Sequence, residues 1–337
     1  MFTLKSNQQY FWIRFRFDYH FVEVRQTFFH VRTCLSFSSI DARWDQQGMT
    51  IAGKSGYGHR LDQLSAPFGI YIDDDNESIY IADYNNARIL EWKANARSGR
   101  IVAGGNGSGN RTDQLEQPTD VIVDRQNNSV IIADGGNRRV IRWSRQTTPH
   151  GQIIISDIDC WGLTVHKDGT FYVSDCMKNE VRRWKKGQKN GTLVAGGNGQ
   201  GNHLNQLNNP THLFVADDHT LYVSDRDNHR VMKWAKGAKV GIVVAGGNER
   251  GDRLHQLSYP RGVMVDVFNQ IYVADHGNNR IVRWAEGATE GTLVVGGTGK
   301  GKQANQLFGP VRFSFDREGN LYVADCLNNR IQKYMID

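Results

Sequence analysis

GNGQGNHLNQLNNPTHLFVADDHTLYVSDRDNHRVMKW, residues 197–234, is one nearly complete copy of a unit that returns along this chain. The second apolar run of each unit ends in Ala-Asp or Ser-Asp, and six units carry this ending. Successive units lie 51, 41, 50, 50 and 50 residues apart, as counted between Asp83, Asp134, Asp175, Asp225, Asp275 and Asp325. A sustained period of this length is typical of repeat architectures.

The unit at 261–296 shows what each repeat contains. RGVMVD, QIYVAD, RIVRW and TLVVG read as four short strands, separated by turn residues such as Phe268-Asn269 and Gly277-Asn278-Asn279. The second strands are apolar at successive positions, which indicates that both of their faces are covered. Four antiparallel strands per repeat, stacked blade on blade, predict an all-β, six-bladed β-propeller.

The two ends of the repeat array complement each other. The last unit stops after three strands, at 330–334, while an orphan fourth strand, MTIAG at 49–53, precedes the first complete unit. We expect the two to pair, because closure of the ring removes an exposed sheet edge. The propeller is therefore predicted to span 49–337, and 1–48 to be an N-terminal extension in which FWIRFRFDYHFVEVR, at 11–25, reads as a strand.

The repeated phrase GxGxxxxQLxxPxGVxVDxxxxxYVADxxNxRIxxW resembles the NHL repeat over roughly residues 50–334. Kelch repeats have a similar period, but no Tyr and Trp follow Gly246-Gly247 at kelch spacing. The resemblance implies a recognition module for protein substrates or RNA, of the kind found beside RING domains. The four cysteines form no Cys-x-x-Cys pair, so any ubiquitin-ligase activity needs a RING from a partner.

Two recurrent patterns have structural explanations. The Gly-x-Gly stretches, such as Gly199 to Gly201, lead through Gln-Leu-x-x-Pro into a strand, whereas a dinucleotide loop opens a helix. The Asp, Asn and Arg of each Asp-x-x-Asn-x-Arg unit are expected to cap a tight turn. The third unit departs from this pattern with Lys178 and Glu180.

The candidate binding residues lie where the first strand of each unit begins. The Gly of the Pro-x-Gly motif is replaced in alternate units, and the preceding position varies as well. Aromatic and arginine side chains suit a binding surface. The predicted site comprises Phe68, Asp120, Trp161, His212, Arg261 and Arg312, with His276 beside a motif aspartate.

Two other interpretations of these positions stay open. The side chains could plug the centre of the ring. Alternatively, His212, Asp120 and His276 could hold a metal, as in the peptide-amidating lyase that this family resembles, although one His and one carboxylate at the ring fall short of three ligands. We expect no cofactor, no metal and no catalytic residue.

Cys160 and Cys176 are equidistant from the turn at Asp168-Gly169, so the sequence predicts that they face each other on neighbouring strands as a disulfide pair. Cys34 and Cys326 are a second candidate pair. The connection that leads to Trp161 is shorter than its counterparts, which predicts a notch beside that residue.

A formal charge of +6 and a pI near 9.1 permit nucleic-acid contact without requiring it. No apolar run reaches the length of a membrane span, and the N-terminus lacks a signal-peptide core, so a cytoplasmic location is expected, with secretion as the alternative if the natural start differs.

The function predicted from these features is a non-catalytic scaffold that presents a propeller face to a protein or peptide. A recognition adaptor for a ubiquitin-ligase pathway or for RNA is one alternative. A metal-dependent lyase or hydrolase of the propeller type is the other.

Overall fold

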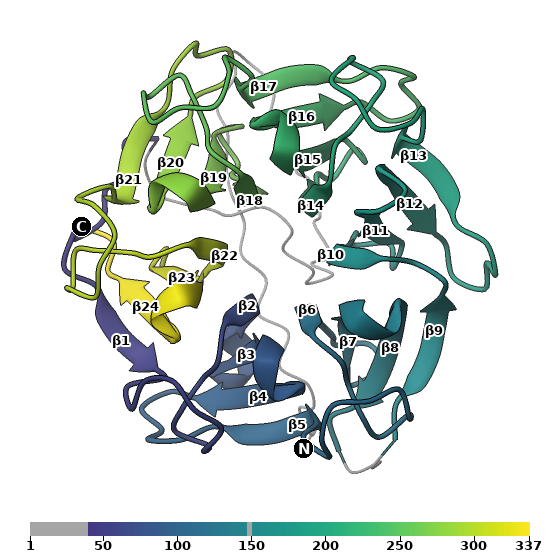
Figure 1. Cartoon of the computed structure of the whole chain (residues 1–337), viewed down its shortest axis with the longest axis vertical. Coiled ribbons are helices and arrows are strands. Elements are labelled where there is room, and N and C mark those ends of the chain that lie inside the picture. Colours follow the sequence, from purple (N-terminus) through teal and green to yellow (C-terminus); the bar gives the residue numbers. More distant parts are fainter. Residues whose placement is uncertain (1–39, 147–149) are drawn as a thin grey trace, which may run out of the picture. The chain divides into compact units, whose positions relative to one another are not determined.

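The computed structural model describes residues 40–146 and 150–337. Within these ranges the chain forms six four-stranded antiparallel sheets arranged in a ring (Figure 1). No helix in the described ranges has the length and apolar character needed to cross a membrane. The predicted six-bladed, all-β fold is confirmed, whereas the strand expected at 11–25 and the candidate Cys34 lie outside the described residues.

The inner strand of each blade lies nearest the centre of the ring (Figure 1). These strands are, from blade 1 to blade 6, β2 (Pro67–Asp73), β6 (Pro118–Asp124), β10 (Cys160–Val165), β14 (Pro210–Val215), β18 (Pro260–Val265) and β22 (Pro310–Phe315). The second strands are β3 (Ser78–Asp83), β7 (Ser129–Asp134), β11 (Phe171–Asp175), β15 (Leu221–Asp225), β19 (Ile271–Asp275) and β23 (Leu321–Asp325).

The third strands are β4 (Arg88–Lys93), β8 (Arg139–Ser144), β12 (Glu180–Trp184), β16 (Arg230–Trp234), β20 (Arg280–Trp284) and β24 (Arg330–Tyr334). The outer strands are β5 (Arg100–Gly104), β9 (Gln152–Ser156), β13 (Thr192–Gly196), β17 (Ile242–Gly246), β21 (Thr292–Gly296) and, in blade 6, β1 (Met49–Ala52).

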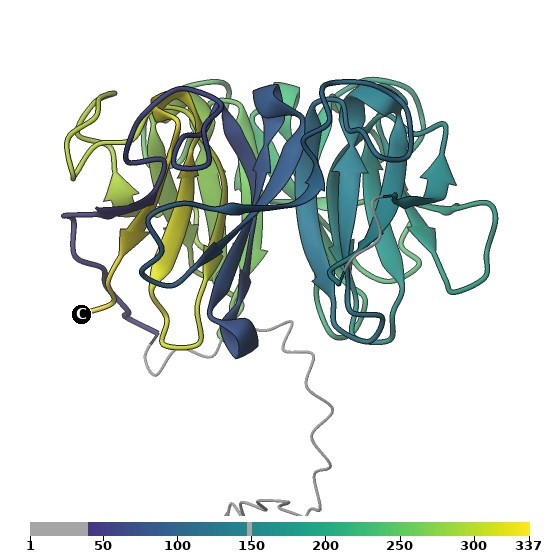
Figure 2. The same cartoon turned by 90° about the horizontal axis from the view of Figure 1, so that it is seen from below.

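Short 3₁₀ helices connect the second and third strands of five blades, and another, η1 (Asp74–Asn76), connects β2 and β3. The five are η2 (Tyr84–Asn86), η3 (Gly135–Asn137), η4 (Arg226–Asn228), η5 (His276–Asn278) and η6 (Cys326–Asn328). We call the end of the ring that carries η2–η6 and the connections between blades the crossover face. The end that carries the hairpins between inner and second strands, η1 among them, is the hairpin face (Figure 2).

The N-terminal strand closes the ring, as predicted. β1 pairs antiparallel with β24, with Met49 opposite Lys333 and Thr50 opposite Gln332. A Cβ at Gly48 would come within 2.7 Å of the Tyr334 ring, and Gly99, Gly191, Gly241 and Gly291 lie equally close over the tryptophans of their own blades. The closing strand thus reproduces a packing contact that the complete blades make within one stretch of chain.

Residues before β1 also pack on the propeller. Trp44 is buried against Tyr272 and Phe315, and its indole N–H donates to the carbonyl of Gly319 at 2.9 Å. The side chain of Arg283 donates to the carbonyl of Ala42 at 3.0 Å. The described part of the predicted extension therefore contributes to the core of the last two blades.

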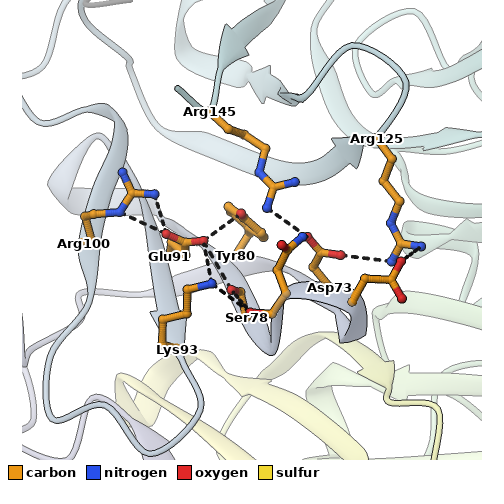
Figure 3. A network of polar contacts seen from close by, with 10 residues as sticks. Asp73, Ser78, Tyr80, Glu91, Lys93, Arg100, Arg125 and Arg145 are labelled. Carbon is orange, nitrogen blue, oxygen red and sulfur yellow. Dashed lines mark hydrogen bonds and ion pairs between the residues drawn. The ribbon is translucent and has the colours of Figure 1, made fainter. Parts of the chain in front are cut away.

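Ion pairs on the hairpin face link blade 1 to its neighbours (Figure 3). The buried carboxylate of Asp73 accepts from Arg125 and Arg145 of blade 2, each at 3.0 Å. Asp75 pairs with Arg317 of blade 6 at 2.6 Å. Charged contacts therefore support the junction where the ring closes.

Candidate functional site

The predicted site residues come together around the centre of the crossover face. All six inner strands begin there, and each has a β-bulge within its first few residues, for example between Pro67 and Ile70 and between Pro260 and Val263. A bulge re-aims the side chains that it contains. We call the two residues after the first residue of each inner strand the inner ring: 68–69, 119–120, 161–162, 211–212, 261–262 and 311–312.

Glycine alternates with larger residues around the inner ring. Gly69, Gly162 and Gly262 belong to blades 1, 3 and 5, and a Cβ on these glycines would lie 2.6, 2.7 and 2.9 Å from backbone atoms of the next blade. The atoms approached are those of Asp120 and of the stretches around His212 and Arg312. The three glycines therefore make room for the replacements in blades 2, 4 and 6.

The first layer of the inner ring comprises Phe68, Trp161 and Arg261, and together with Tyr84 of η2 these residues form an aromatic and cationic group that we call the Arg261 cluster. Phe68 stacks on Tyr84 with ring centroids 4.3 Å apart and lies 5.7 Å from Trp161. The Arg261 guanidinium sits 5.3 Å from the centroid of Phe68 and 5.0 Å from that of Trp161. Blades 1, 3 and 5 thus meet through cation–π contacts.

One residue further along the strands lies a polar layer formed by Asp120, His212 and Arg312. A carboxylate oxygen of Asp120 is 3.8 Å from a guanidinium nitrogen of Arg312 and accepts from the backbone N–H of Leu163 at 3.1 Å. Asp120 and His212 have no solvent-exposed surface. The burial of these side chains is what the plug interpretation expects, and the choice between a plug and a binding surface stays open.

Burial dominates the electrostatics of both layers. It raises the pKa of Asp120 against the opposing influence of Arg312, and together with Arg312 and Arg261 it lowers the pKa of His212 well below its usual value. Burial and the nearby Arg226 lower the pKa of Arg261 to about 10, so this guanidinium stays charged at neutral pH. The inner ring therefore holds two cations, one carboxyl group and one neutral imidazole.

Several buried donors of the inner ring have no hydrogen-bond partner among the described residues. They include Nε and one terminal nitrogen of Arg261, Nε of Arg312, and the indole N–H of Trp161. A buried polar group without a partner costs about 1–3 kcal/mol, and more when it is charged. These donors are suited to an acceptor from outside the chain.

His276 lies near Arg261, whose charge helps to lower its pKa, and it contacts the next blade. Its Nδ1 lies 3.2 Å from the carbonyl oxygen of Pro310 in the next blade, and burial lowers its pKa to about 3. In the described part of the chain, Asp120, His212 and His276 do not form a group of ligand atoms close enough to share a metal ion. The structure therefore places His276 at a contact between blades.

The Asp-x-x-Asn-x-Arg units form the turns predicted for them. In blade 5, Asp275 accepts from Ser258 N–H at 2.7 Å, from Asn278 at 2.8 Å and from Arg280 at 2.8 Å. Arg280 also donates to three carbonyl oxygens of the preceding crossover. Blades 1, 2, 4 and 6 repeat the Asp–Arg ion pair at 2.7 Å.

Blade 3 differs in both its turn and its crossover. Asp175 there accepts from the backbone of Lys178 at 2.9 Å, and Glu180 pairs with Arg182. Only residues 157–159 connect β9 to β10, whereas 105–117 connect β5 to β6, so the predicted short connection beside Trp161 is present. Ile158 is buried in this short connection, at the place of the buried leucines of the longer ones.

The register predicted for the two cysteines is wrong by one residue. Leu163 pairs with Val173 as expected, but the bulge between Cys160 and Leu163 places Cys160 opposite Asp175. Both thiols are free, and burial raises the pKa of Cys176 to about 11. Cys160 begins β10 and Cys176 directly follows β11, the strand paired with it, and a disulfide between them stays a prediction. Cys326, the described member of the second candidate pair, is also a free, buried thiol, packed near Phe68.

The structure adds residues that the sequence did not single out. Tyr84 and Arg226 directly follow motif aspartates, and Met177 and Leu327 lie two residues after theirs. Met177 and Leu327 are exposed, which gives the crossover face an apolar rim. The only signal in the sequence was their position in the variable part of the Asp-x-x-Asn-x-Arg unit.

Comparisons with solved structures support the fold. An auxiliary nutrient binding protein from Bacteroides thetaiotaomicron is 15% identical, with 87% of this chain and 72% of that chain covered and a TM-score of 0.65. A gluconolactonase from Xanthomonas campestris is 14% identical, with coverage of 90% and 94% and a TM-score of 0.61. A chain of a nidogen/laminin complex is 15% identical, with coverage of 70% and 81% and a TM-score of 0.53.

These neighbours include binding proteins and enzymes, and at this identity they share the fold alone. No curated protein matches the sequence. The family model for the NHL repeat matches residues 257–284, which run from the end of one crossover through β20 of blade 5. The chain is thus a six-bladed β-propeller, and the unit in its fifth blade contains a match to the NHL repeat.

Proposed function

We propose that this protein is a binding propeller whose crossover face takes a protein or peptide partner, with an acidic group of that partner placed at the Arg261 cluster. The observation that carries the proposal is the set of buried donors on Arg261 and Trp161 that have no hydrogen-bond partner among the described residues, together with Nε of Arg312, whose guanidinium lies 3.8 Å from Asp120. A carboxylate matches the planar fork of a guanidinium and would satisfy several of them together.

The surroundings of these donors favour a peptide over a free anion. Trp161 and Tyr84 are partly exposed beside Arg261, so they offer aromatic contact area around the charge. The exposed side chains of Met177 and Leu327 add apolar area at the rim. Buried aromatic and arginine anchors surrounded by a wider rim are typical of the centres of protein interfaces.

RNA is the less favoured ligand. Stacking of a base on Trp161 is conceivable chemically, but phosphate binding usually relies on a run of free cations. Here Arg226 pairs with Asp227 at 3.2 Å, and Arg312 lies near Asp120. Both of these cations already have an acidic neighbour, so they do not supply the run of free cations that phosphate binding usually needs.

The test is selection of a displayed random peptide library on the immobilised full-length protein, followed by affinity measurements with the enriched peptides. We expect these peptides to share an acidic residue next to aromatic or apolar ones. Trp161→Ala and Arg261→Met should each weaken binding by about 30-fold or more, as expected for hot-spot residues. The exposed Lys185 and Lys186, at the end of β12 away from the crossover face, supply the matched control, and their replacement by Ala should leave binding unchanged.

Three results would overturn the proposal. The first is a lack of peptide enrichment, and the second is binding that is lost in the lysine variants and kept in the other two. The third is a different ligand at the same residues: capture of single-stranded RNA, or turnover of a lactone, that depends on Trp161 and Arg261 would assign the site to another class.

A further inference from the structure

A second polar cluster lies on the hairpin face, between blades 3 and 4, away from the inner ring. His166 and Asp168 belong to the hairpin between β10 and β11, and His219 to the hairpin between β14 and β15. Of the histidine, cysteine and carboxylate side chains in the described ranges, these three bring one ligand atom each within 4.8 Å of one another.

The separations are close to those around a bound metal ion. Nδ1 of His166 is 2.8 Å from Oδ1 of Asp168, and Nε2 of His219 is 3.6 Å from Oδ2 of the same carboxylate. Zinc bonds of about 2.0–2.1 Å in a tetrahedral arrangement place neighbouring ligand atoms about 3.3 Å apart. The two imidazole rings are already adjacent, with centroids 3.9 Å apart, so small side-chain rotations suffice.

Each imidazole is held through the nitrogen that points away from the cluster. Nε2 of His166 lies 3.2 Å from the carbonyl oxygen of Asp217, and Nδ1 of His219 lies 2.8 Å from the hydroxyl of Tyr172. A carbonyl oxygen only accepts, so Nε2 of His166 carries a proton and donates. Metal-binding histidines are typically oriented in this way by a carbonyl or another acceptor on the far nitrogen.

His166 and Asp168 present acceptor atoms to the same space. Nδ1 of His166 lies 2.8 Å from Oδ1 of Asp168, and only a weak donor, the backbone N–H of Asp168 at 3.3 Å, points to that nitrogen. A metal cation placed between the nitrogen and the carboxylate would contact both.

We infer that His166, Asp168 and His219 bind a divalent transition-metal ion, with zinc as the best match to two imidazoles and one carboxylate. Imidazole nitrogen is a preferred ligand of zinc, and the carboxylate supplies the negative charge. Lys236 and Arg183 lie near His219 and oppose a cation, whereas Lys167 is paired with Asp217 at 2.9 Å. Asp168 is the acidic ligand that offsets them.

The site would link the hairpins of two neighbouring blades. Blade 3 has the altered turn unit and the short crossover, and the hairpins of blades 3 and 4 meet through these histidines. A pocket lined by Tyr172, His219 and Lys236 adjoins the cluster. Asp168 is about half exposed, so an ion can reach the ligands from solvent.

The test is a titration of the metal-free full-length protein with Zn²⁺ by calorimetry, together with thermal melts. We expect one ion per chain and a rise in melting temperature. Asp168→Asn and His219→Asn should each weaken binding at least about tenfold and reduce the rise. Asn suits position 219 because its backbone φ is +67°, a left-handed conformation that Asn tolerates well.

His203→Gln is the matched control, because His203 is an exposed histidine on a crossover and should not affect binding. A tetrahedral visible spectrum of the Co²⁺ form, lost in His219→Asn, would support the assigned ligands. If Zn²⁺ neither binds nor stabilises the protein, the inference fails. Equal binding by all three variants would also overturn it.

Discussion

Arg280 in a repeated turn unit and Arg261 in the inner ring are both 8% exposed, yet their surroundings are opposite. Arg280 bonds to one carboxylate and three carbonyl oxygens. Arg261 lies on two aromatic rings and leaves two of its nitrogens without a partner among the described residues. The two arginines are therefore equally buried, but the hydrogen-bond donors of Arg280 are satisfied within the fold and some of those of Arg261 are not.

This difference distinguishes positions that stabilise the propeller from positions that are available to bind a ligand. The Asp–Arg pair recurs in five blades of the described chain, and in each it ties a turn to the crossover before it. The inner ring differs from blade to blade, and several of its polar groups have no hydrogen-bond partner among the described residues. Unsatisfied buried groups persist where something other than stability maintains them.

The largest loss of folding stability should come from breaking the Asp–Arg ion pair of a repeated turn unit. Asp275→Ala leaves Arg280 buried without its carboxylate, and loss of one partner of a buried ion pair typically costs about 3–5 kcal/mol. Asp175→Ala in blade 3 should cost about 1–3 kcal/mol, because Asp175 accepts mainly from backbone and its lysine neighbour is half exposed. Urea unfolding of both variants measures the two values, and equal losses would show that the arginine network is not what stabilises the turn.

The sequence was sufficient for the features that repeat. The period, the strand pattern and the orphan MTIAG strand predicted six blades and their closure, because the same sequence pattern recurs in every blade. Consensus breaks at Asp120, His212 and Arg312 marked the inner ring. The stacking of Phe68 on Tyr84 was not predictable, since Tyr84 occupies a variable position with no periodic signal.

Two other features were not predicted from the sequence. A bulge near the start of every inner strand shifts the register, and in blade 3 it places Cys160 opposite Asp175, so the two cysteines do not face each other as predicted. His166 and His219 lie in equivalent hairpins of neighbouring blades, but neither belongs to the repeated motif. Only the placement of blade 3 beside blade 4 brings them together.

A smaller loss of folding stability is expected when the pH is lowered. Burial lowers the pKa of His212 and His276, so below the unfolded pKa of about 6.5 the unfolded chain binds protons that the folded chain does not. The contribution of these two histidines to stability should therefore rise with pH up to about 6.5 and then level off. Each such histidine contributes about 1.4 kcal/mol per pH unit. Urea unfolding at about pH 5 and pH 7.5 should show a shallower loss for His212→Leu than for the wild type. Identical losses would mean that the imidazole is protonated in the fold.

The smallest effect on stability, and the sharpest contrast, should come from Arg261→Met. The substitution keeps an unbranched side chain between Phe68 and Trp161 and removes a buried charge that has no ion pair. The lost cation–π attraction, about 0.5–2 kcal/mol, and the relieved desolvation of the guanidinium oppose each other, so we expect a change within about 1 kcal/mol of either sign. Arg280→Met, at equal exposure, leaves Asp275 unpaired and should cost about 3–5 kcal/mol. Thermal and urea unfolding of the two variants side by side give the difference.

A large loss of stability in Arg261→Met would mean that the inner ring is a structural plug, and the unpartnered donors would then no longer argue for a ligand. A near-neutral Arg261→Met that loses its selected peptides would place that residue among those that use the ring rather than build it.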